Sequence, residues 1–482
     1  MQTIAEGYLD APVFRLVSRV AAGLGVRAFV IGGYVRDCFL GRPSKDIDIV
    51  VEGSGIALAE AVGREVKTGV SVFRNFGTAM LHYDGIELEF VGARRESYDR
   101  GSRKPFVEDG TLEEDQLRRD FTINAMAFSL QEADFGALID PFGGIRDLVA
   151  GIIRTPLDPR QTYSDDPLRM LRAIRFQVQL STPEHPFTIV EESLLAIQEM
   201  QDRLQILSRE RIVEEVNKML LTERPSTAFR LMDQTGLLGQ FLPQLVQLKG
   251  VETVEGKGHK ENFSHTLEVL DNVAAGEREA GQAPKLWLRW AALLHDIGKP
   301  ASKRYQPGLG WTFHGHEVLG ARMVPKIFQA LKMPLGEPMK YVQKLVSLHL
   351  RPIALVDEEV TDSAVRRLLF DAGDDIDDLM LLCHADITSK NPAKVARLHR
   401  NFILVKEKLV EVEAKDAIRN FKNPITGDYI MQVFGIEPCN TIGCIKEEVK
   451  NAILDGLIPN EFDAADALMR EVAARYGLTP VS

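Results

Sequence analysis

Cysteine is scarce in this sequence, and the runs that mark exported or membrane proteins are absent. The 482 residues hold four scattered cysteines with no CxxC pair, which argues against a disulfide framework and a thiolate zinc site. The 38 glycines and 23 prolines are too few for a low-complexity chain. No run of about 18 uncharged residues could form a membrane helix, and no basic segment precedes an apolar core at the N-terminus. We therefore expect a protein of the reducing cytoplasm that folds throughout and has no membrane partner.

Length and charge set the scale of the molecule. At roughly 150 residues per domain, 482 residues predict about three to four domains. Hydrophobic residues make up 45% and charged residues 26%, as in ordinary globular proteins. The formal net charge is −11, so the average field of the protein repels anions. An anionic partner would have to meet a local basic surface.

The character of the sequence changes after its first third. Four short runs bounded by Gly or Asp predict strands before residue 150: RAFVIGG, DIDIVV, GTAMLHY and IELEFVG. From about residue 160 onward, amphipathic helical periodicity dominates. We therefore expect an α+β head with a mixed sheet, followed by all-α domains. The expected boundaries are 1–150 for the head, 151–248 for an α-helical neck, 249–390 for a third domain and 391–482 for a helical tail, with the Gly-rich, charged stretch 249–262 as the linker.

Two carboxylates share one face of a predicted strand. Asp46 and Asp48 lie two residues apart in KDIDIVVEG, and side chains alternate across a strand. Such a pair repels unless a cation neutralises it, and Mg²⁺ held by carboxylates and substrate phosphates is the usual solution in phosphoryl transfer. A solvated edge strand is the alternative for an isolated pair of this kind.

A glycine pair and an arginine stand shortly before this strand. Gly32 and Gly33 follow an apolar run, where missing side chains allow backbone amides to approach a phosphate beside Arg36. The whole stretch GGYVRDCFLGRPSKDIDIVVEG resembles the DNA polymerase β-like nucleotidyltransferases, in particular the branch of class II tRNA nucleotidyltransferases and poly(A) polymerases. The resemblance implies that Asp46 and Asp48 hold Mg²⁺ and are catalytic, and that Gly33 and Arg36 bind the nucleotide.

Two further motifs extend the resemblance. LRRDFTINAMAF is similar to the next family motif, in which Arg119 contacts the incoming nucleotide, although RRD by itself could be a solvated turn. In YSDDPLRMLRAIRF, we expect Asp166 as the N-cap and Pro167 as the first helical residue. Arginines then follow in steps of three, which predicts a connected polar stripe on one helix: Arg169, Arg172 and Arg175.

The resemblance gives this helix a role in selecting the nucleotide. It implies that Asp166 and Arg169 read the Watson–Crick edges of CTP and ATP, while Arg172 and Arg175 support base and phosphates. Asp165 replaces the Glu that is usual in the motif. A simple helix cap and a solvated arginine face are the structural alternatives. The run SRERIVEEVNKML, from residue 208 to 220, matches the family's neck motif and is expected to support the helix.

A second group of histidines and aspartates lies in the helical part of the sequence. His265 lies in NFSHTLEVLDN, and His295 with Asp296 lies in ALLHDIGKP, a pattern that resembles the HD superfamily of metal phosphohydrolases. Neighbouring helical residues point about 100° apart, so an HD pair converges best at a helix end. His316, His349 and Asp386 also fall at predicted helix ends. Apolar residues three, four and seven positions before Asp386 place it on a buried face.

We assign four core metal ligands and two additions. Imidazole and carboxylate suit Mn²⁺, Fe²⁺, Ni²⁺ or Co²⁺. The core ligands are His265, His295, Asp296 and Asp386, and the additions that could hold a second metal are His316 and His349. The alternative is a set of satisfied core histidines.

Together, these resemblances imply one main function and leave rivals open. The implied function is template-independent addition of CMP, CMP and AMP to the 3′ end of tRNA from CTP and ATP, with a phosphohydrolase activity in the HD domain. The segment from Asn423 to Asn460 resembles a tRNA-binding tail, so the expected partner is tRNA, held at its acceptor end and elbow. The rivals are a poly(A) polymerase, a partial CC- or A-adding enzyme, and an HD phosphohydrolase whose head only binds RNA.

Overall fold

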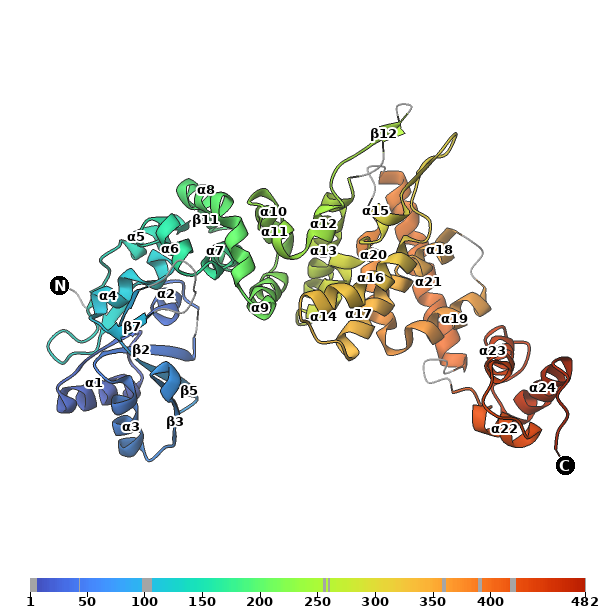
Figure 1. Ribbon diagram of the computed structural model, residues 1–482, viewed down its shortest axis with the longest axis horizontal. Helices are drawn as coiled ribbons and strands as arrows, with labels where there is room; N and C mark the ends of the chain where they lie inside the picture. The colour runs from blue at the N-terminus through green and yellow to red at the C-terminus, as the bar shows by residue number, and fades with distance from the viewer. Residues whose placement is uncertain are drawn as a thin grey trace. The chain divides into compact units, whose positions relative to one another are not determined.

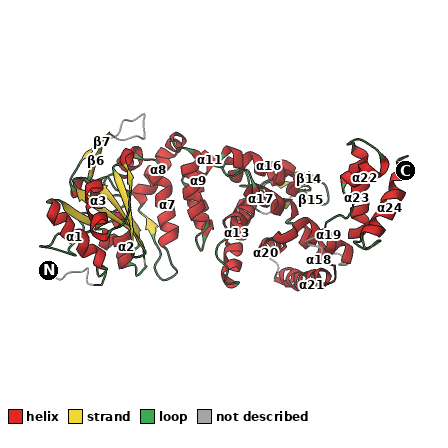
Figure 2. Ribbon diagram, turned by 90° about the horizontal axis from the view of Figure 1, so that it is seen from below, coloured by secondary structure: helices red, strands yellow, loops and turns green. Residues whose placement is uncertain are grey.

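The chain folds into two compact units, Met1–Pro243 and Gln244–Ser482, which are described separately. The computed structural model describes residues 7–42, 44–97, 106–254, 257–258, 261–357, 361–388, 392–416 and 422–481. Strands concentrate in the first unit and helices dominate the second (Figure 1; Figure 2). Among the helices of these residues, none is both long and apolar enough to cross a membrane.

A seven-stranded mixed sheet forms the centre of the first unit. Its spatial order is β3-β4-β5-β2-β1-β8-β9, with β2 and β5 parallel and the other neighbouring pairs antiparallel. The strands are β1 (Arg27–Ile31), β2 (Asp46–Glu52), β3 (Val70–Phe73), β4 (Thr78–Tyr83), β5 (Ile86–Gly92), β8 (Ala127–Ser129) and β9 (Leu138–Ile139). Two strands outside this sheet, β6 (Arg94–Ser97) and β7 (Phe106–Asp109), pair with each other.

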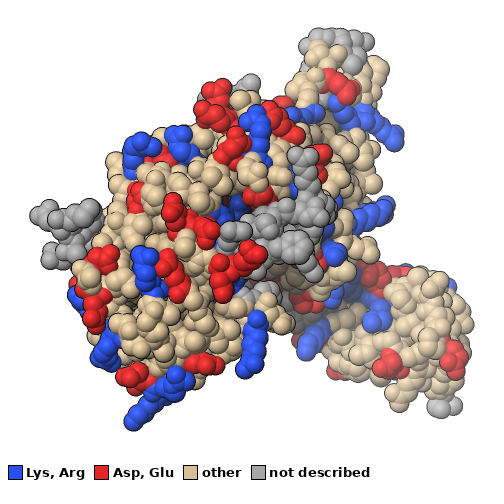
Figure 3. All heavy atoms as spheres, turned by 60° about the vertical axis from the view of Figure 1, so that its left-hand side comes forward, with Lys and Arg blue, Asp and Glu red and all other residues tan. Residues whose placement is uncertain are grey.

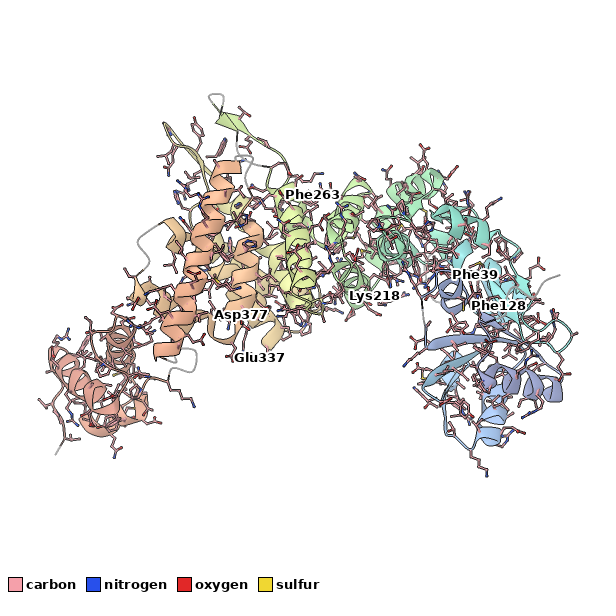
Figure 4. All side chains as sticks on the ribbon, turned by 180° about the vertical axis from the view of Figure 1, so that it is seen from behind. Phe39, Phe128, Lys218, Phe263, Glu337 and Asp377 are labelled. Atoms are coloured by element: carbon pink, nitrogen blue, oxygen red, sulfur yellow. The ribbon has the colours of Figure 1, made fainter. Side chains whose placement is uncertain are left out.

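Apolar residues of the sheet pack against the helices of the head. α3 packs on β4 and β5, so closely that a Cβ at Gly55 would lie 2.8 Å from the Val91 backbone. α2 packs beside β8, where the ring centroids of Phe39 and Phe128 are 5.8 Å apart (Figure 4). The helices of the head are α1 (Pro12–Leu24), α2 (Gly33–Phe39), α3 (Gly55–Val66), α4 (Leu112–Leu117) and α5 (Gly144–Ala150), with the 3₁₀ turns η1 (Arg74–Phe76) and η2 (Thr122–Asn124).

The rest of the first unit is almost entirely helical. α7 packs against both α9 and α10 and carries the predicted arginine stripe. The elements are α6 (Pro159–Asp165), α7 (Leu168–Leu180), α8 (Glu191–Met200), η3 (Gln201–Ile206), α9 (Arg209–Leu220), α10 (Pro225–Gln234) and α11 (Leu237–Phe241), with the short parallel pair β10 (Ile152–Ile153) and β11 (Thr188–Ile189). α12 (Pro243–Val246) lies at the boundary between the units.

The described residues of the second unit form helices and two small hairpins. In its core, Arg289 donates to Glu277 at 2.9 Å, and both side chains are buried. The helices are α13 (Asn262–Glu279), α14 (Leu286–Leu294), α15 (Lys299–Ser302), α16 (His316–Ala330), α17 (Glu337–Leu348), α18 (Arg351–Asp357), α19 (Asp362–Ala372), η4 (Gly373–Asp375), α20 (Ile376–Asp386), α21 (Pro392–Asp416), α22 (Gly427–Phe434), α23 (Asn440–Leu454) and α24 (Phe462–Arg475). The hairpins are β12 (Thr253–Val254) with β13 (Lys257–Gly258), and β14 (Arg304–Gln306) with β15 (Gly310–Thr312).

The expected fold class is confirmed: a mixed α/β head precedes helical regions. The stretch 249–262, expected as a linker, contains the hairpin β12–β13, and the two compact units divide a few residues before it. The four domain boundaries stay a prediction. On the face that Figure 3 shows, Lys and Arg side chains are interspersed with Asp and Glu, so no charge of one sign dominates that face.

Candidate active sites

The two aspartates of the head lie at the start of β2 and share one face of the strand, as the alternation of side chains predicts. Asp46 is exposed and Asp48 is half-buried, whereas Ile47 and Ile49 are buried on the opposite face. Burial and the neighbouring Asp46 raise the pKa of Asp48, although the guanidinium of Arg119 opposes the shift. The pair therefore holds negative charge in a place where it is costly without a cation.

The adjacent parallel strand adds two carboxylates that sequence reasoning missed. In the register of β2 and β5, Glu87 lies beside Asp46 and Glu89 lies beside Asp48. Burial and Asp48 raise the pKa of Glu89, so the two carboxyl groups feel each other's charge. Glu89 could have been suspected from the alternation of IELEF, but only the pairing of the strands shows which carboxylate it meets.

Of the glycine pair, Gly32 is the one that the packing requires. Its φ is +81°, and a Cβ there would lie 2.9 Å from Nη1 of Arg119 and 3.4 Å from Oδ2 of Asp48. A Cβ at Gly33 would make only an ordinary contact, 3.7 Å from Arg36. The Gly32 amide donates to the carbonyl of Met126, so this amide is engaged within the protein. Gly32 thus provides the space that Arg119 needs beside Asp48.

Arg119 and its neighbour Arg118 are anchored by a buried carboxylate. Nε of Arg119 donates to Asp115 at 3.2 Å, and Nη2 of Arg118 donates to Asp115 at 2.6 Å. Burial opposes ionisation of Asp115, but the two guanidinium groups outweigh it and lower its pKa. Asp115 therefore fixes the side chain that the resemblance assigns to the nucleotide.

Arg36 on α2 and Arg172 on α7 are linked through two buried side chains. Arg36 donates to Oδ1 of Asn124 at 2.7 Å, Asn124 donates to Asp120 at 3.0 Å, and Arg172 donates to Asp120 at 2.7 Å. Burial opposes ionisation of Asp120, but Arg172 and Asn124 outweigh it and lower its pKa to about 2. This chain of contacts joins the head to the predicted nucleotide-reading helix.

Asp166 makes two contacts at the start of α7. Its Oδ1 accepts the backbone N–H of Leu168 at 3.1 Å, and its Oδ2 accepts a hydrogen bond from Arg211 of α9 at 3.2 Å. α7 begins at Leu168 with Pro167 before it, one residue later than expected, but Asp166 is extended and its side chain makes the capping bond, as expected. Proline has no N–H and offers no side-chain oxygen, so the carboxylate one residue earlier supplies the capping bond.

The three stripe arginines of α7 have different surroundings. Arg169 donates to the carbonyl of Arg118 at 2.5 Å and is half-buried. Arg175 is buried and donates to Glu215 of α9 at 2.5 Å. Arg175 therefore holds α7 against α9, and its contact with a nucleotide stays a prediction. The buried Leu168, Leu171 and Ile174 lie where the periodicity predicts them.

The second unit brings all six predicted metal-binding residues together. Each lies at or next to a helix end except His265, which is in the first turns of α13. Within the described residues, two groups of three side chains converge as metal ligands do: His265, His295 and Asp386, and Asp296, His316 and His349. Both groups lie in the second unit.

Asp296 lies between the two groups. Its Oδ2 is 3.4 Å from Nε2 of His295, and its Oδ1 is 3.3 Å from Nε2 of His316. Within the first group, Nε2 of His265 is 2.8 Å from Oδ1 of Asp386. One carboxylate can thus contribute to two adjacent ions.

The outer nitrogens of the histidines fix their orientation. The Nδ1 atoms of His295, His316 and His349 lie 2.7, 2.8 and 2.7 Å from backbone carbonyl oxygens. A carbonyl only accepts, so each Nδ1 carries a hydrogen and Nε2 is the ring atom that is directed inward. His265 differs, because its Nδ1 lies 3.0 Å from the hydroxyl of Thr388.

These contacts fit a divalent cation. Nε2 of His316 and Nε2 of His349 are 3.3 Å apart, close enough for both nitrogens to bind one cation. The buried Nε2 of His295 makes no hydrogen bond among the described residues. Burial lowers the pKa of His295, but the carboxylates of Asp296 and Asp386 outweigh it and raise this pKa to about 10. The carboxylates demand positive charge at this point, which a metal can supply in place of the proton.

Three segments of the chain match known protein families. Family profiles described as "Poly A polymerase head domain", "Probable RNA and SrmB- binding site of polymerase A" and "HD domain" match residues 28–154, 186–248 and 262–390.

Three curated relatives illustrate the similarity. A "Multifunctional CCA protein" of Stenotrophomonas maltophilia is 34% identical over 355 residues, which are 71% of this chain and 80% of the relative. The protein of the same name from Cupriavidus metallidurans is 33% identical over 320 residues, 64% of this chain and 71% of the relative. An "A-adding tRNA nucleotidyltransferase" of Aquifex aeolicus is 49% identical over 156 residues, but these are 32% of this chain and only 19% of that protein.

Solved structures share the fold. A CCA-adding enzyme in complex with ATP aligns over 98% of both chains with a TM-score of 0.64 and 23% identity, a likeness that concerns the fold alone. A tRNA nucleotidyltransferase complexed with a primer tRNA and an incoming ATP analogue aligns over 83% of this chain and 99% of its own, with a TM-score of 0.58 and 25% identity.

The fold and the matched segments together define the class. A mixed sheet with paired carboxylates, joined to helices and an HD unit, is the architecture of a nucleotidyltransferase with an attached HD domain. The chain belongs to the tRNA nucleotidyltransferase and poly(A) polymerase family, in the branch that includes the multifunctional CCA proteins. Divalent metals are the general cofactors of both kinds of domain.

Proposed function

We propose that this protein adds CMP, CMP and AMP to the 3′ end of tRNA, using CTP and ATP and releasing pyrophosphate. The observation that carries the proposal is the position of Asp48. This carboxylate lies beside Asp46 and Glu89 and faces Arg119 across the space that Gly32 leaves open. Carboxylates, an arginine and a glycine next to one another suit the reaction of a nucleoside triphosphate with a hydroxyl group.

Mg²⁺ is the metal that we propose for the head. Asp46 and Asp48 would hold it, with Glu89 beside them, because hard carboxylate oxygens and triphosphate oxygens suit Mg²⁺. When bound, the metal supplies charge neutralisation for the phosphates and the attacking oxygen. Arg119, held by Asp115, positions the triphosphate, and Arg36 and Arg172 support the site through Asn124 and Asp120.

The selection of CTP and ATP follows from the chemistry of Asp166 and Arg169. Cytosine and adenine each carry an exocyclic amino group, whereas uracil and guanine carry a carbonyl oxygen at the corresponding place. An ionised carboxylate only accepts hydrogen bonds and a guanidinium only donates them. Asp166 therefore suits the amino group of C and A and repels the carbonyl of U and G. Arg211 holds the carboxylate in place through its 3.2 Å bond.

For the HD unit we propose a metal-dependent phosphohydrolase activity, on a 2′,3′-cyclic phosphate or a damaged 3′ end. Its ligands would be His265, His295, Asp296 and Asp386, with His316 and His349 for a second ion, and the metal Mn²⁺, Fe²⁺, Ni²⁺ or Co²⁺. The inward Nε2 atoms and the shared Asp296 support this assignment. Imidazole with carboxylate suits these borderline metals better than Mg²⁺.

The proposed partners and domains follow from this function. We infer that tRNA binds with its acceptor end at the head and its elbow at the tail, with boundaries at 1–150, 151–248, 249–390 and 391–482. A cytoplasmic location agrees with a tRNA substrate and with four free cysteines.

An A-adding enzyme is the second candidate. It is favoured by the 49% identity that 156 residues share with an A-adding protein. The test is incubation of the purified chain with tRNA lacking CCA and with tRNA ending in CC, with CTP and ATP both present and one of the two labelled at a time. The proposal expects CTP and then ATP to be incorporated on the first tRNA. ATP incorporation on the CC-ending tRNA alone would establish the A-adding enzyme, and long ATP tails a poly(A) polymerase. No incorporation at all would refute the proposal and leave the hydrolase with an RNA-binding head.

A further inference from the structure

The last three helices of the second unit pack around a core of their own. Buried side chains from α22, α23 and α24 form this core, among them Phe434, Val449 and Met469. Among the described residues, the members of this cluster all follow α21 in the sequence. We call residues 422–481 the tail module. Its position on the other helices depends on contacts outside its core.

One carboxylate of the tail module is bound to α19. Oδ1 of Asp455 accepts a hydrogen bond from the hydroxyl of Ser363 at 2.6 Å and another from Nε of Arg367 at 3.1 Å. Nη2 of Arg367 lies 2.9 Å from both oxygens of Asp455, and Nη1 donates to Oδ1 of Asn451 at 3.1 Å. We call these four residues the tail joint.

The stability of α23 alone does not explain the position of Asp455. Asp455 is the C-cap of α23, where the helix dipole makes a negative charge unfavourable. Ser363 lies in the first turn of α19, where the dipole favours a negative charge. Hydrogen bonds from Ser363 and Arg367 lower the pKa of Asp455, so the tail joint stabilises its ionised form. The contacts with α19 therefore account for a carboxylate at this position.

Residues next to the tail joint are fitted to the same contact. Gly456 has a φ of +72°, and a Cβ there would lie 2.8 Å from Nη1 of Arg366. Nζ of Lys450 lies 5.4 Å from the ring centre of Phe370. α19 in turn packs against α17, α20 and α21. The tail joint thus connects the tail module to the helices of the HD unit.

We propose that Asp455 and Arg367 are positioning residues for tRNA: their contact fixes the tail module on α19 and thereby places the elbow of the tRNA. The inference rests on the function proposed above, in which the head binds the acceptor end and the tail binds the elbow. A ligand held at two places binds more tightly when the second place is already fixed, because less freedom is lost on binding. The side chains of Arg367 and Asp455 are 40% and 36% exposed, so their contact contributes little to the folding of either part.

Nucleotide addition by the full-length chain tests the proposal with two RNA substrates. One is tRNA lacking CCA, and the other is a hairpin of its acceptor stem, which has no elbow. Asp455→Ala and Arg367→Ala should each raise the KM for the tRNA about 5-fold and leave the KM for the hairpin unchanged. The double variant should have the same KM as either single variant, because all three lack the same contact.

The opposite charges of the two residues separate positioning from simple electrostatics. A direct effect of charge on tRNA binding would lower the KM in Asp455→Ala and raise it in Arg367→Ala. The control is Asp466→Ala, which removes the same charge as Asp455→Ala and an ion pair with Arg470 within α24, and which should not raise the KM. Opposite changes in the two variants, equal rises for both RNAs, a similar rise in Asp466→Ala, or no rise at all would each overturn the proposal.

A distance measurement tests the tail joint independently of catalysis. One nitroxide label is placed on Cys439, which is exposed on the tail module, and one at Arg322→Cys on α16, in a chain with Cys38→Ser and Cys444→Ser. Electron spin resonance should give one narrow distribution of distances, and Asp455→Ala should broaden it. An unchanged distribution would overturn the proposal. If the unmutated chain extends neither RNA, the function proposed above is wrong, and the distribution still decides whether the tail joint fixes the tail module.

Discussion

Replacing Asp166 separates its capping role from its proposed role in base selection. As a cap, Asp166 bonds the Leu168 N–H, and loss of such a bond costs about 1 kcal/mol. Its half-exposed pair with Arg211 adds at most about 1 kcal/mol. Asp166→Ala should therefore lower the free energy of unfolding of this unit by about 1–2 kcal/mol. Asp166→Asn keeps an oxygen that can accept the capping bond, so its stability should stay close to that of the wild type.

Base selection should respond differently to the same two variants. A hydrogen bond from a base to a charged acceptor is worth about 1.5–3 kcal/mol, or about 10- to 150-fold in kcat/KM. Both variants should lower the preference for CTP over UTP by this factor. Asp166→Ala removes the acceptor, and Asp166→Asn places an N–H donor at the site. The assay is single-nucleotide incorporation into truncated tRNA with each of the four nucleotides, run beside urea unfolding curves.

The combination of results decides between the two roles. If Asp166→Asn is as stable as the wild type and as selective, Asp166 is a helix cap and the proposed reading of the base is wrong. If selectivity falls only in Asp166→Ala, in proportion to its loss of stability, the effect is again structural. Only a stable Asp166→Asn with relaxed selection supports the proposal.

Three further predictions concern other parts of the two sites. Asp48→Asn should lower the rate of nucleotide addition about 100-fold or more, without lowering the Tm of the metal-free protein, because burial and Asp46 already raise the pKa of this carboxyl. Thr388→Val should weaken transition-metal binding about 10- to 100-fold in an equilibrium titration, and Thr388→Ser should not, because the hydroxyl orients His265. The pKa of Asp120 is lowered to about 2, so its ionised form stabilises the fold above pH 4. The stability difference between the wild type and Asp120→Asn, about 2 kcal/mol at most, should shrink as the pH falls from about 4 toward 2.

The local features of both sites were predictable because they depend on short-range geometry. Alternation along β2 placed Asp46 and Asp48 on one face, and the periodicity of α7 placed its leucines inside. The resemblance to the HD superfamily, rather than any local pattern, brought His295, His316, His349 and Asp386 into one set; the structure places them close together, and their role as metal ligands stays a prediction.

What the sequence could not provide were contacts between distant segments. Glu89 meets Asp48 only because β2 and β5 are parallel neighbours, a pairing that no local pattern specifies. Asp120 looks like part of a basic turn until its bond to Arg172, 52 positions away, is seen. Thr388 lies 123 positions from His265. Buried polar residues of this kind take their roles from the partner that the fold supplies.

The two metal sites should be separable by mutation, because each draws its ligands from a different unit. Asp46, Asp48 and Glu89 belong to Met1–Pro243, whereas both groups of converging histidines belong to Gln244–Ser482. His295→Ala combined with Asp296→Ala removes a ligand from each group, since His295 belongs to the first and Asp296 to the second. The double variant should lose bound transition metal and phosphohydrolase activity and retain nucleotide addition.

The control is His384, which lies at the same end of α20 as Asp386 but does not belong to either group of converging side chains. His384 lies two residues before Asp386, but its ring packs on His399 at 4.6 Å, so His384→Ala should retain the metal. Because metal binding contributes to folding, circular dichroism must establish that the double variant is folded. A folded double variant that no longer adds nucleotides but still cleaves phosphodiesters would contradict this division.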